Sequence, residues 1–150
     1  MGLAGCILQA ILHNPLASAS TLGVSQGATF GAAFAIVTLN LTGGVAISLW
    51  SFLGSIAVAV VILGLSRLKQ VSAEGIVLAG VAISSMLGGA TTLIQYFANE
   101  IQLSNLVFWT FGDLGSTDWN DLRGMALMVL VLIVYCTLHR WDYNALLNGE

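Results

Sequence analysis

Charged side chains are scarce in this sequence. Only 7% of its 150 residues are Asp, Glu, Lys or Arg, whereas 57% are hydrophobic and the mean hydropathy is +0.93. Soluble domains carry about 25% charged residues. Three runs, Met1–Ser66, Gly75–Asn99 and Gly124–His139, contain no charged residue at all. Because a membrane span needs about 20 apolar residues, this distribution predicts several crossings of a membrane and excludes an ordinary water-soluble domain.

Residues that catalysis, metal binding or cofactor binding would need are also few. Lys69 is the only lysine and no G-x-x-x-x-G-K-[ST] loop occurs, which excludes ATP hydrolysis by P-loop chemistry. His13 and His139 have no further ligands at metal-site spacing. No catalytic dyad or triad and no cluster of basic residues is evident. We therefore expect no enzyme activity of the chain itself, no metal site, no cofactor and no nucleic-acid partner.

The interiors of the predicted spans lack ionisable carboxylates. Transporters driven by protons or sodium usually hold the coupling ion with Asp, Glu or His inside the membrane. Their absence argues against ion-driven transport by this segment.

The apolar runs and the turn residues between them predict an all-α, polytopic transmembrane helical bundle. Residues 1–12 resemble the end of a helix, which His13-Asn14-Pro15 terminates because the residue before proline avoids the α region. We predict four full spans after it, Leu22–Leu39, Val45–Leu65, Gly75–Phe97 and one within Leu122–Leu138. We expect residues 1–150 to form a single transmembrane domain.

The segment Ile101–Trp119 is too polar to span a membrane and too apolar for a plain loop. Leu103, Leu106, Val107 and Phe111 recur at helical spacing, and tryptophans lie nearby. The pattern predicts a short helix at the outer membrane interface, where Trp is enriched. Packing against another subunit is the alternative.

The basic residues predict the orientation in the membrane. Arg67, Lys69 and Arg140 fall in turns that share one side of the predicted bundle, and Arg123 alone falls on the other side. Positive charge favours the cytoplasmic side. We therefore place Arg67 and Lys69 in the cytoplasm.

Small residues recur at every fourth position in two of the spans, at Gly23, Gly27 and Gly31 and again at Gly80, Ser84 and Gly88. This spacing lines one helix face with little side-chain bulk, so that two backbones can approach closely. The first interpretation is packing within the chain. The alternative for the second stripe is a subunit interface or a pathway for a bulky solute. Neutral polar residues of the same span, Thr91 and Gln95, suit either helix–helix hydrogen bonds or contacts with a solute.

Several motifs occur in an order that resembles one transporter family. Asn14-Pro15-Leu16-Ala17 leads into Thr21-Leu22-Gly23-Val24-Ser25-Gln26-Gly27-Ala28, and Leu78-Ala79-Gly80-Val81-Ala82 follows later. Phe108-Trp109 stands before Gly112 and Gly115, and the chain closes with residues 146–150. Together these motifs resemble the FecCD/BtuC-type permease family, the transmembrane subunits of ABC importers for iron complexes, haem and cobalamin, over nearly the whole chain. The connector that carries the resemblance comprises Asn14, Pro15, Gly23, Ser25 and Gly27.

The resemblance implies an architecture and a set of partners. By its motifs the chain begins late in the second helix of a family member and stops after the sixth, so that it is a fragment of a longer domain. The family's permeases are homodimers in the inner (plasma) membrane, with a separate ATP-binding subunit below and an extracytoplasmic substrate-binding protein above. The pathway or dimer-interface candidates are then Gly80, Ser84, Gly88, Thr91 and Gln95. The cytoplasmic gate candidates are Ser72, Ala73 and Glu74.

Three functions remain open from the sequence. The first is a permease subunit that translocates an iron–siderophore or a related metal chelate. The second is a truncated, non-transporting remnant of the same family. The third is a small membrane channel or scaffold that self-associates through its glycine faces.

Overall fold

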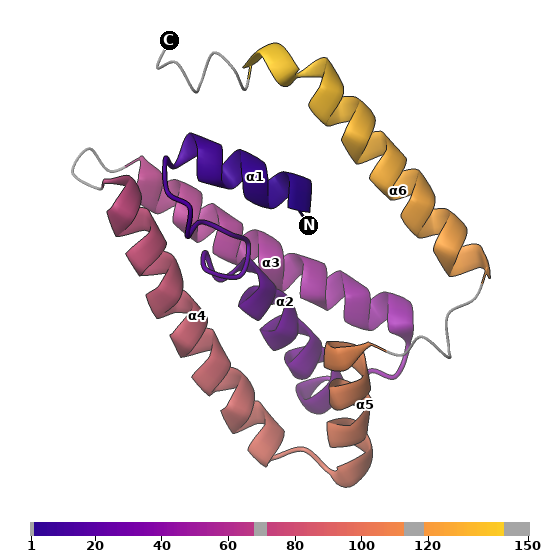
Figure 1. Ribbon diagram of the computed structural model, residues 1–150. Coiled ribbons are helices and arrows are strands. Elements are labelled where there is room, and N and C mark those ends of the chain that lie inside the picture. Colours follow the sequence, from indigo (N-terminus) through magenta and orange to yellow (C-terminus); the bar gives the residue numbers. More distant parts are fainter. Residues whose placement is uncertain (1, 68–71, 113–118, 143–150) are drawn as a thin grey trace. The chain divides into compact units, whose positions relative to one another are not determined.

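The computed structural model describes residues 2–67, 72–112 and 119–142, and every regular element among them is a helix. Contacts divide the chain into two units, residues 1–111 and 112–150. The first unit contains α1 (Gly2–Ile11), α2 (Val24–Ala33), the π-helical turn η1 (Phe34–Thr38), α3 (Gly44–Ser66), α4 (Ala73–Tyr96) and α5 (Glu100–Phe111), and the second contains α6 (Trp119–Leu138) (Figure 1). The prediction of an all-α fold is confirmed for these residues, and a single domain stays a prediction.

Within the described residues, two helices are long and apolar enough to cross a membrane. They are α3 with 23 residues and α4 with 24 residues. At 1.5 Å per residue they measure about 35 Å, which exceeds the hydrocarbon thickness of about 30 Å. Both agree closely with the predicted spans Val45–Leu65 and Gly75–Phe97. Val24–Thr38 and Leu122–Leu138 are shorter apolar helices, so the count of four spans stays a prediction.

Helices α2 and α3 pack with their backbones in direct contact. A Cβ atom built on Gly27 would lie 2.6 Å from the carbonyl oxygen of Gly54 and 2.7 Å from Cγ2 of Val58. One built on Gly31 would overlap the carbonyl oxygen of Trp50. In a membrane, small residues permit this close approach where lipid supplies no hydrophobic drive for association. The first predicted stripe of small residues therefore serves packing within the chain.

Apolar side chains fill the rest of the first unit in two clusters. The first cluster joins Leu22, Val58, Ile62 and Ile76, and Leu8 and Leu12 of the segment around α1 pack against it. The second cluster comprises Ala32, Ala33, Ile36, Ile47 and Leu106. Through them α2 and η1 become the centre of the unit, with α3, α4 and α5 packed around them.

The outward faces of the two long helices carry large exposed apolar side chains. On α3 these include Leu49, Phe52, Val60 and Leu63, and on α4 they include Leu78, Met86, Leu93 and Tyr96. A soluble monomer seldom exposes an apolar surface of this extent. Such faces suit contact with lipid or with another protein.

Helix α5 folds back onto the end of η1 instead of extending α4 (Figure 1). Leu106 is fully buried against the second cluster, and Trp109 packs against the same cluster. Gly112 follows the helix with φ 81°, the left-handed conformation that commonly ends a helix. The prediction of a short helix in this segment is confirmed. Leu106 packs within its own chain, whereas Val107, Phe108 and Phe111 remain exposed, so the outer membrane interface and packing against another subunit both stay predictions.

Helix α6 forms the regular part of the second unit. Just beyond it, the ring of His139 stacks on Tyr135 with centroids 4.3 Å apart, and the Arg140 guanidinium lies 5.3 Å from the ring centre of Trp141. Aromatic and basic side chains of this kind are typical of membrane–water interfaces. Lys69, Gly115 and the motif at 146–150 lie outside the described residues.

Candidate functional site: a pocket between the connector and the start of α4

The predicted gate residues form the first turn of α4. Ser72 is the N-cap, with φ −72° and ψ 163°, and its hydroxyl accepts a hydrogen bond of 3.2 Å from the Gly75 amide. Glu74 lies in the first turn and is exposed, a position where a carboxylate favours the helix dipole. These residues therefore fix where α4 begins.

The connector before α2 turns sharply at His13, which has φ 48°. The Asn14 side chain stabilises the turn by accepting a hydrogen bond of 2.9 Å from the amide of Leu16, and Gln9 Nε2 donates to the Pro15 carbonyl at 3.0 Å. Asn14 and Pro15 thus shape the backbone between α1 and the segment that enters α2. The predicted helix end before Pro15 is confirmed, since α1 ends at Ile11.

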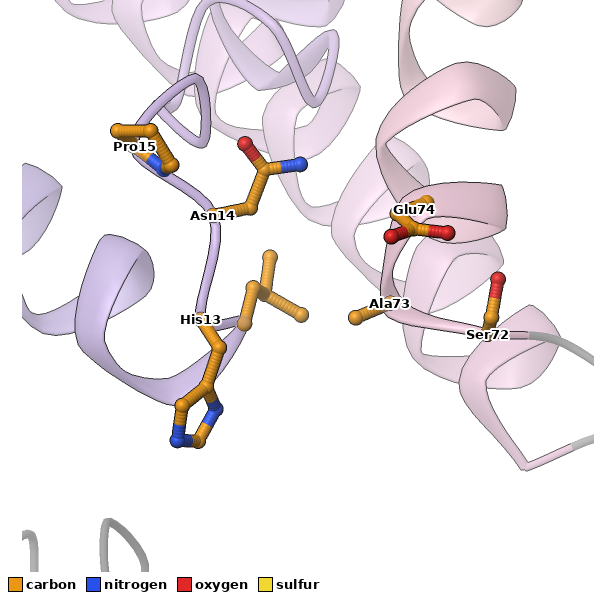
Figure 2. Close-up of a pocket in the computed structure, with 7 residues that line it drawn as sticks. His13, Asn14, Pro15, Ser72, Ala73 and Glu74 are labelled. Atoms are coloured by element: carbon orange, nitrogen blue, oxygen red, sulfur yellow. The ribbon is translucent and has the colours of Figure 1, made fainter.

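A pocket of about 430 Å³ separates these two turns. Figure 2 shows His13, Asn14 and Pro15 along one side and Ser72, Ala73 and Glu74 along the other. The structure therefore brings together the connector and the gate candidates, which are almost 60 positions apart in the sequence. The Glu74 carboxylate in this lining is exposed and can accept hydrogen bonds, whereas the His13 ring points away from the residues of α4 (Figure 2). Among the described residues, no group of three or more His, Cys, Asp or Glu is placed to hold a metal ion.

The connector also contains a pair of reciprocal hydrogen bonds, between Ser18 and Thr21, that was not predicted from the sequence. The amide of Ser18 donates to Thr21 Oγ1 at 2.8 Å, and the amide of Thr21 donates to Ser18 Oγ at 3.0 Å. Thr21 Oγ1 also donates to the Leu16 carbonyl at 2.9 Å. Ser and Thr three residues apart commonly exchange such bonds with the backbone. The Ser-x-x-Thr spacing is the sequence pattern from which this turn could have been predicted.

The first two pathway candidates pack against this connector. A Cβ atom on Gly80 would lie 2.7 Å from Cα of Leu22, and Ser84 Oγ donates to the Ser20 carbonyl at 3.2 Å. Gly23, with φ 82°, lies directly against the same part of α4. Packing within the chain, the first of the two interpretations, describes Gly80 and Ser84 in this structure.

The other candidates on α4 differ in their surroundings. Thr91 is buried and its hydroxyl donates to the Leu87 carbonyl at 2.8 Å. Gly88 and Gln95 are partly exposed, and a Cβ atom on Gly88 would meet nothing within 4 Å. Ser25, in the connector motif, accepts at its carbonyl a hydrogen bond of 3.2 Å from Thr29 Oγ1 within α2. Of these five candidates, Gly88 therefore has open space beside it and Gln95 is partly exposed.

Replacing Ser84 with alanine should destabilise the contact between α4 and the connector by about 0.6 kcal/mol, a typical value for an interhelical hydrogen bond in a membrane protein. Ser85 provides the matched control, because its hydroxyl bonds only to the Val81 carbonyl of its own helix. The free energy of unfolding in mixed micelles measures both. Equal effects of Ser84→Ala and Ser85→Ala would contradict a role for the Ser84–Ser20 bond.

Comparison with known proteins identifies the family of this helical unit and its connector. A model of the FecCD transport family matches residues 1–150, which is the whole chain. The chain belongs to the FecCD transport family. This FecCD chain is also similar to an ABC transporter permease protein of Methanocaldococcus jannaschii, at 44% identity over 161 residues that cover 100% of the chain and 46% of the relative.

Two further relatives carry more specific names. The vitamin B12 import system permease protein BtuC of Klebsiella pneumoniae is 32% identical over 151 residues, and the hemin transport system permease protein HmuU of Yersinia pestis is 29% identical over 155 residues. Each alignment covers 100% of the FecCD chain and 45% or 46% of the relative. The chain therefore spans about half the length of the curated relatives it matches.

A solved structure shares the fold. It is described as an inward-facing conformation of a metal-chelate type ABC transporter, and it superposes with a TM-score of 0.80 at 24% identity. The match covers 96% of the FecCD chain and 46% of the other chain. The chain thus shares the helical fold of that solved structure.

Proposed function

We propose that this chain is part of the membrane-spanning permease subunit of an ATP-driven importer that translocates an iron–siderophore or a related metal chelate. The match of the FecCD family over residues 1–150 carries the proposal. The names of the relatives, which mention vitamin B12 and hemin, and the metal-chelate type of the similar structure support a bulky chelate as solute.

The proposal includes the setting of the chain in the membrane. We infer a multi-pass protein of the inner (plasma) membrane in which α3, α4, the continuous helix Val24–Thr38 and α6 all cross the bilayer. The lengths and hydropathy of α3 and α4 support the crossings by these two helices. The other two are shorter and require local thinning of the bilayer or packing against neighbouring helices.

The proposal also assigns partners. Two copies of the permease pair, a separate subunit binds and hydrolyses ATP, and an extracytoplasmic protein delivers the chelate. Helix α4 lines the pathway beside the partner copy. The exposed apolar residues of α4, the open position Gly88 and the partly exposed Gln95 support this assignment. The pocket at His13 and Glu74 is then the gate region on the cytoplasmic side.

Uptake into proteoliposomes tests the proposal. The permease polypeptide that contains this chain is reconstituted with its ATP-binding subunit and binding protein, and radiolabelled ferric siderophore, haemin and cobalamin are offered in turn. We expect ATP-dependent accumulation of one chelate class, at least tenfold above vesicles without permease. Equal accumulation in both vesicle types for every chelate would refute it. Ion conduction by the purified chain alone would favour the self-associating channel instead.

A further inference from the structure

Gln102 uses the two ends of its side-chain amide for different helices. Its Oε1 accepts a hydrogen bond of 3.1 Å from the backbone amide of Asn99, and the backbone amide of Gln102 donates to Asn99 Oδ1 at 2.8 Å. This reciprocal pair is a capping box, which satisfies two amides at the start of a helix. The oxygen end of the side chain therefore serves α5.

The nitrogen end serves η1. Gln102 Nε2 donates to the carbonyl of Ile36 at 3.3 Å and to Asn40 Oδ1 at 3.2 Å. Carbonyl groups in the last turn of a helix need donors from outside the helix. Here the chain leaves η1 at Asn40, which has φ 53°, a left-handed conformation that Asn adopts more readily than most residues. One side chain thus caps the start of α5 and the end of η1.

The same face of α5 makes the apolar contact with η1. Leu106 and Trp109 follow Gln102 at intervals of four and seven residues, and both pack against the cluster that contains Ile36. Apolar packing is non-directional and tolerates sliding. Hydrogen bonds require defined distances and angles, so Gln102 determines the register of α5 on η1.

The position of α5 is transmitted to α4 through a short, hydrogen-bonded turn. The amide of Phe97 donates to the Ile94 carbonyl at 3.1 Å, and that of Ala98 donates to the Gln95 carbonyl at 3.1 Å. The turn then reaches Asn99, which caps α5. Gln102 consequently holds the end of α4 that carries Gln95 close to the end of η1.

We propose that Gln102 is a positioning residue that clamps the end of α4 to η1 and so sets the width of the transport pathway at that end. The effect on the transport pathway rests on the proposed function, whereas the clamp itself rests on the hydrogen bonds of Gln102. Alternating access requires helices to change their separation around the solute. Two directional hydrogen bonds from Gln102 favour the arrangement in which α5 is docked.

A pair of variants separates the clamp from the helix cap. Gln102→Glu keeps an oxygen for the Asn99 amide, as Glu does in many capping boxes, but it loses the donor and turns a carboxylate toward the Ile36 carbonyl and Asn40 Oδ1. Asn99→Ala removes the cap oxygen and keeps the Gln102 donor. Only the first variant should release the clamp.

The distance between α5 and η1 provides the first measurement. Spin labels are attached to cysteines introduced at Thr38 and Phe108, both exposed, after the two native cysteines have been replaced by alanine. Double electron–electron resonance in nanodiscs then gives the distribution of distances between the two labels. We expect Gln102→Glu to raise the population of longer distances roughly fivefold, because the hydrogen bond to the Ile36 carbonyl is lost and a carboxylate then faces that oxygen. Asn99→Ala should match the parent protein. An unchanged distribution for Gln102→Glu would overturn the clamp.

The second measurement is the number of ATP molecules hydrolysed per chelate transported in the assembled importer. A change that only lowers the amount of folded permease alters both rates together and leaves this ratio constant. We expect Gln102→Glu to raise the ratio severalfold. Altered distances with an unchanged ratio would overturn the role in transport. If the parent importer moves no chelate, the proposed function fails, whereas the distance measurement still decides whether the clamp exists.

Discussion

Replacing Gly54 with alanine should destabilise the chain by about 1–3 kcal/mol, the range for overpacking a tight interface. A methyl group at this position would overlap the carbonyl oxygen of Gly27 on α2. The obstacle is backbone and not a flexible side chain, so the two helices must separate along their whole contact. Denaturant titration of the purified chain in mixed micelles, followed by circular dichroism, measures the loss.

Gly64→Ala is the matched control on the same helix. A Cβ atom at Gly64 would meet nothing within 4 Å, and alanine is a better helix former than glycine by about 1 kcal/mol. This variant should leave stability unchanged or raise it slightly. If Gly54→Ala were as stable as Gly64→Ala, the direct contact between the backbones of α2 and α3 would be wrong.

Truncating Leu106 to alanine should destabilise the docking of α5 by about 2–5 kcal/mol, as expected for a fully buried leucine whose removal leaves a cavity. Leu106 is 0% exposed and packs among Ala32, Ala33, Ile36 and Ile47. The alanines on the opposite side are too small to collapse into the space. Hydrogen exchange of the α5 amides in nanodiscs should accelerate accordingly.

Leu103→Ala tests whether this effect depends on burial. Leu103 lies on the same helix but is 40% exposed, so its truncation should change exchange in α5 by less than about 1 kcal/mol. Comparable acceleration in the two variants would show that α5 is not anchored through Leu106. The comparison also bears on Gln102, because its hydrogen bonds act on the same face of α5.

The sequence by itself determined the class of the protein and the extent of its two long helices. The predicted spans Val45–Leu65 and Gly75–Phe97 correspond to α3 and α4 with ends shifted by one or two residues. Hydropathy and length are local properties, and they set where a helix can cross a bilayer without reference to the rest of the fold. The family followed from the motifs around Asn14 and Leu78 for a similar reason, since each is a short contiguous pattern.

The sequence could not decide which surface each small residue faces. Gly80 and Ser84 suited a pathway as well as packing, because a four-residue spacing states only that they share a helix face. The tertiary structure placed the connector at Thr21–Gly23 against them. Likewise the pocket joins His13–Pro15 to Ser72–Glu74, two turns that no periodic pattern relates.

The scarcity of charged residues thus predicts a membrane as the medium in which the chain folds, but it does not predict the contacts within the chain. In a membrane, the close approach of helix backbones and a few hydrogen bonds between helices determine how the helices are arranged. Gln102 illustrates the difference. Its partner Asn99 lies three residues away, a spacing that a local sequence pattern can predict. Ile36 and Asn40 lie 66 and 62 positions away in the sequence. Only the folding of α5 back onto η1 brings that donor to its acceptors.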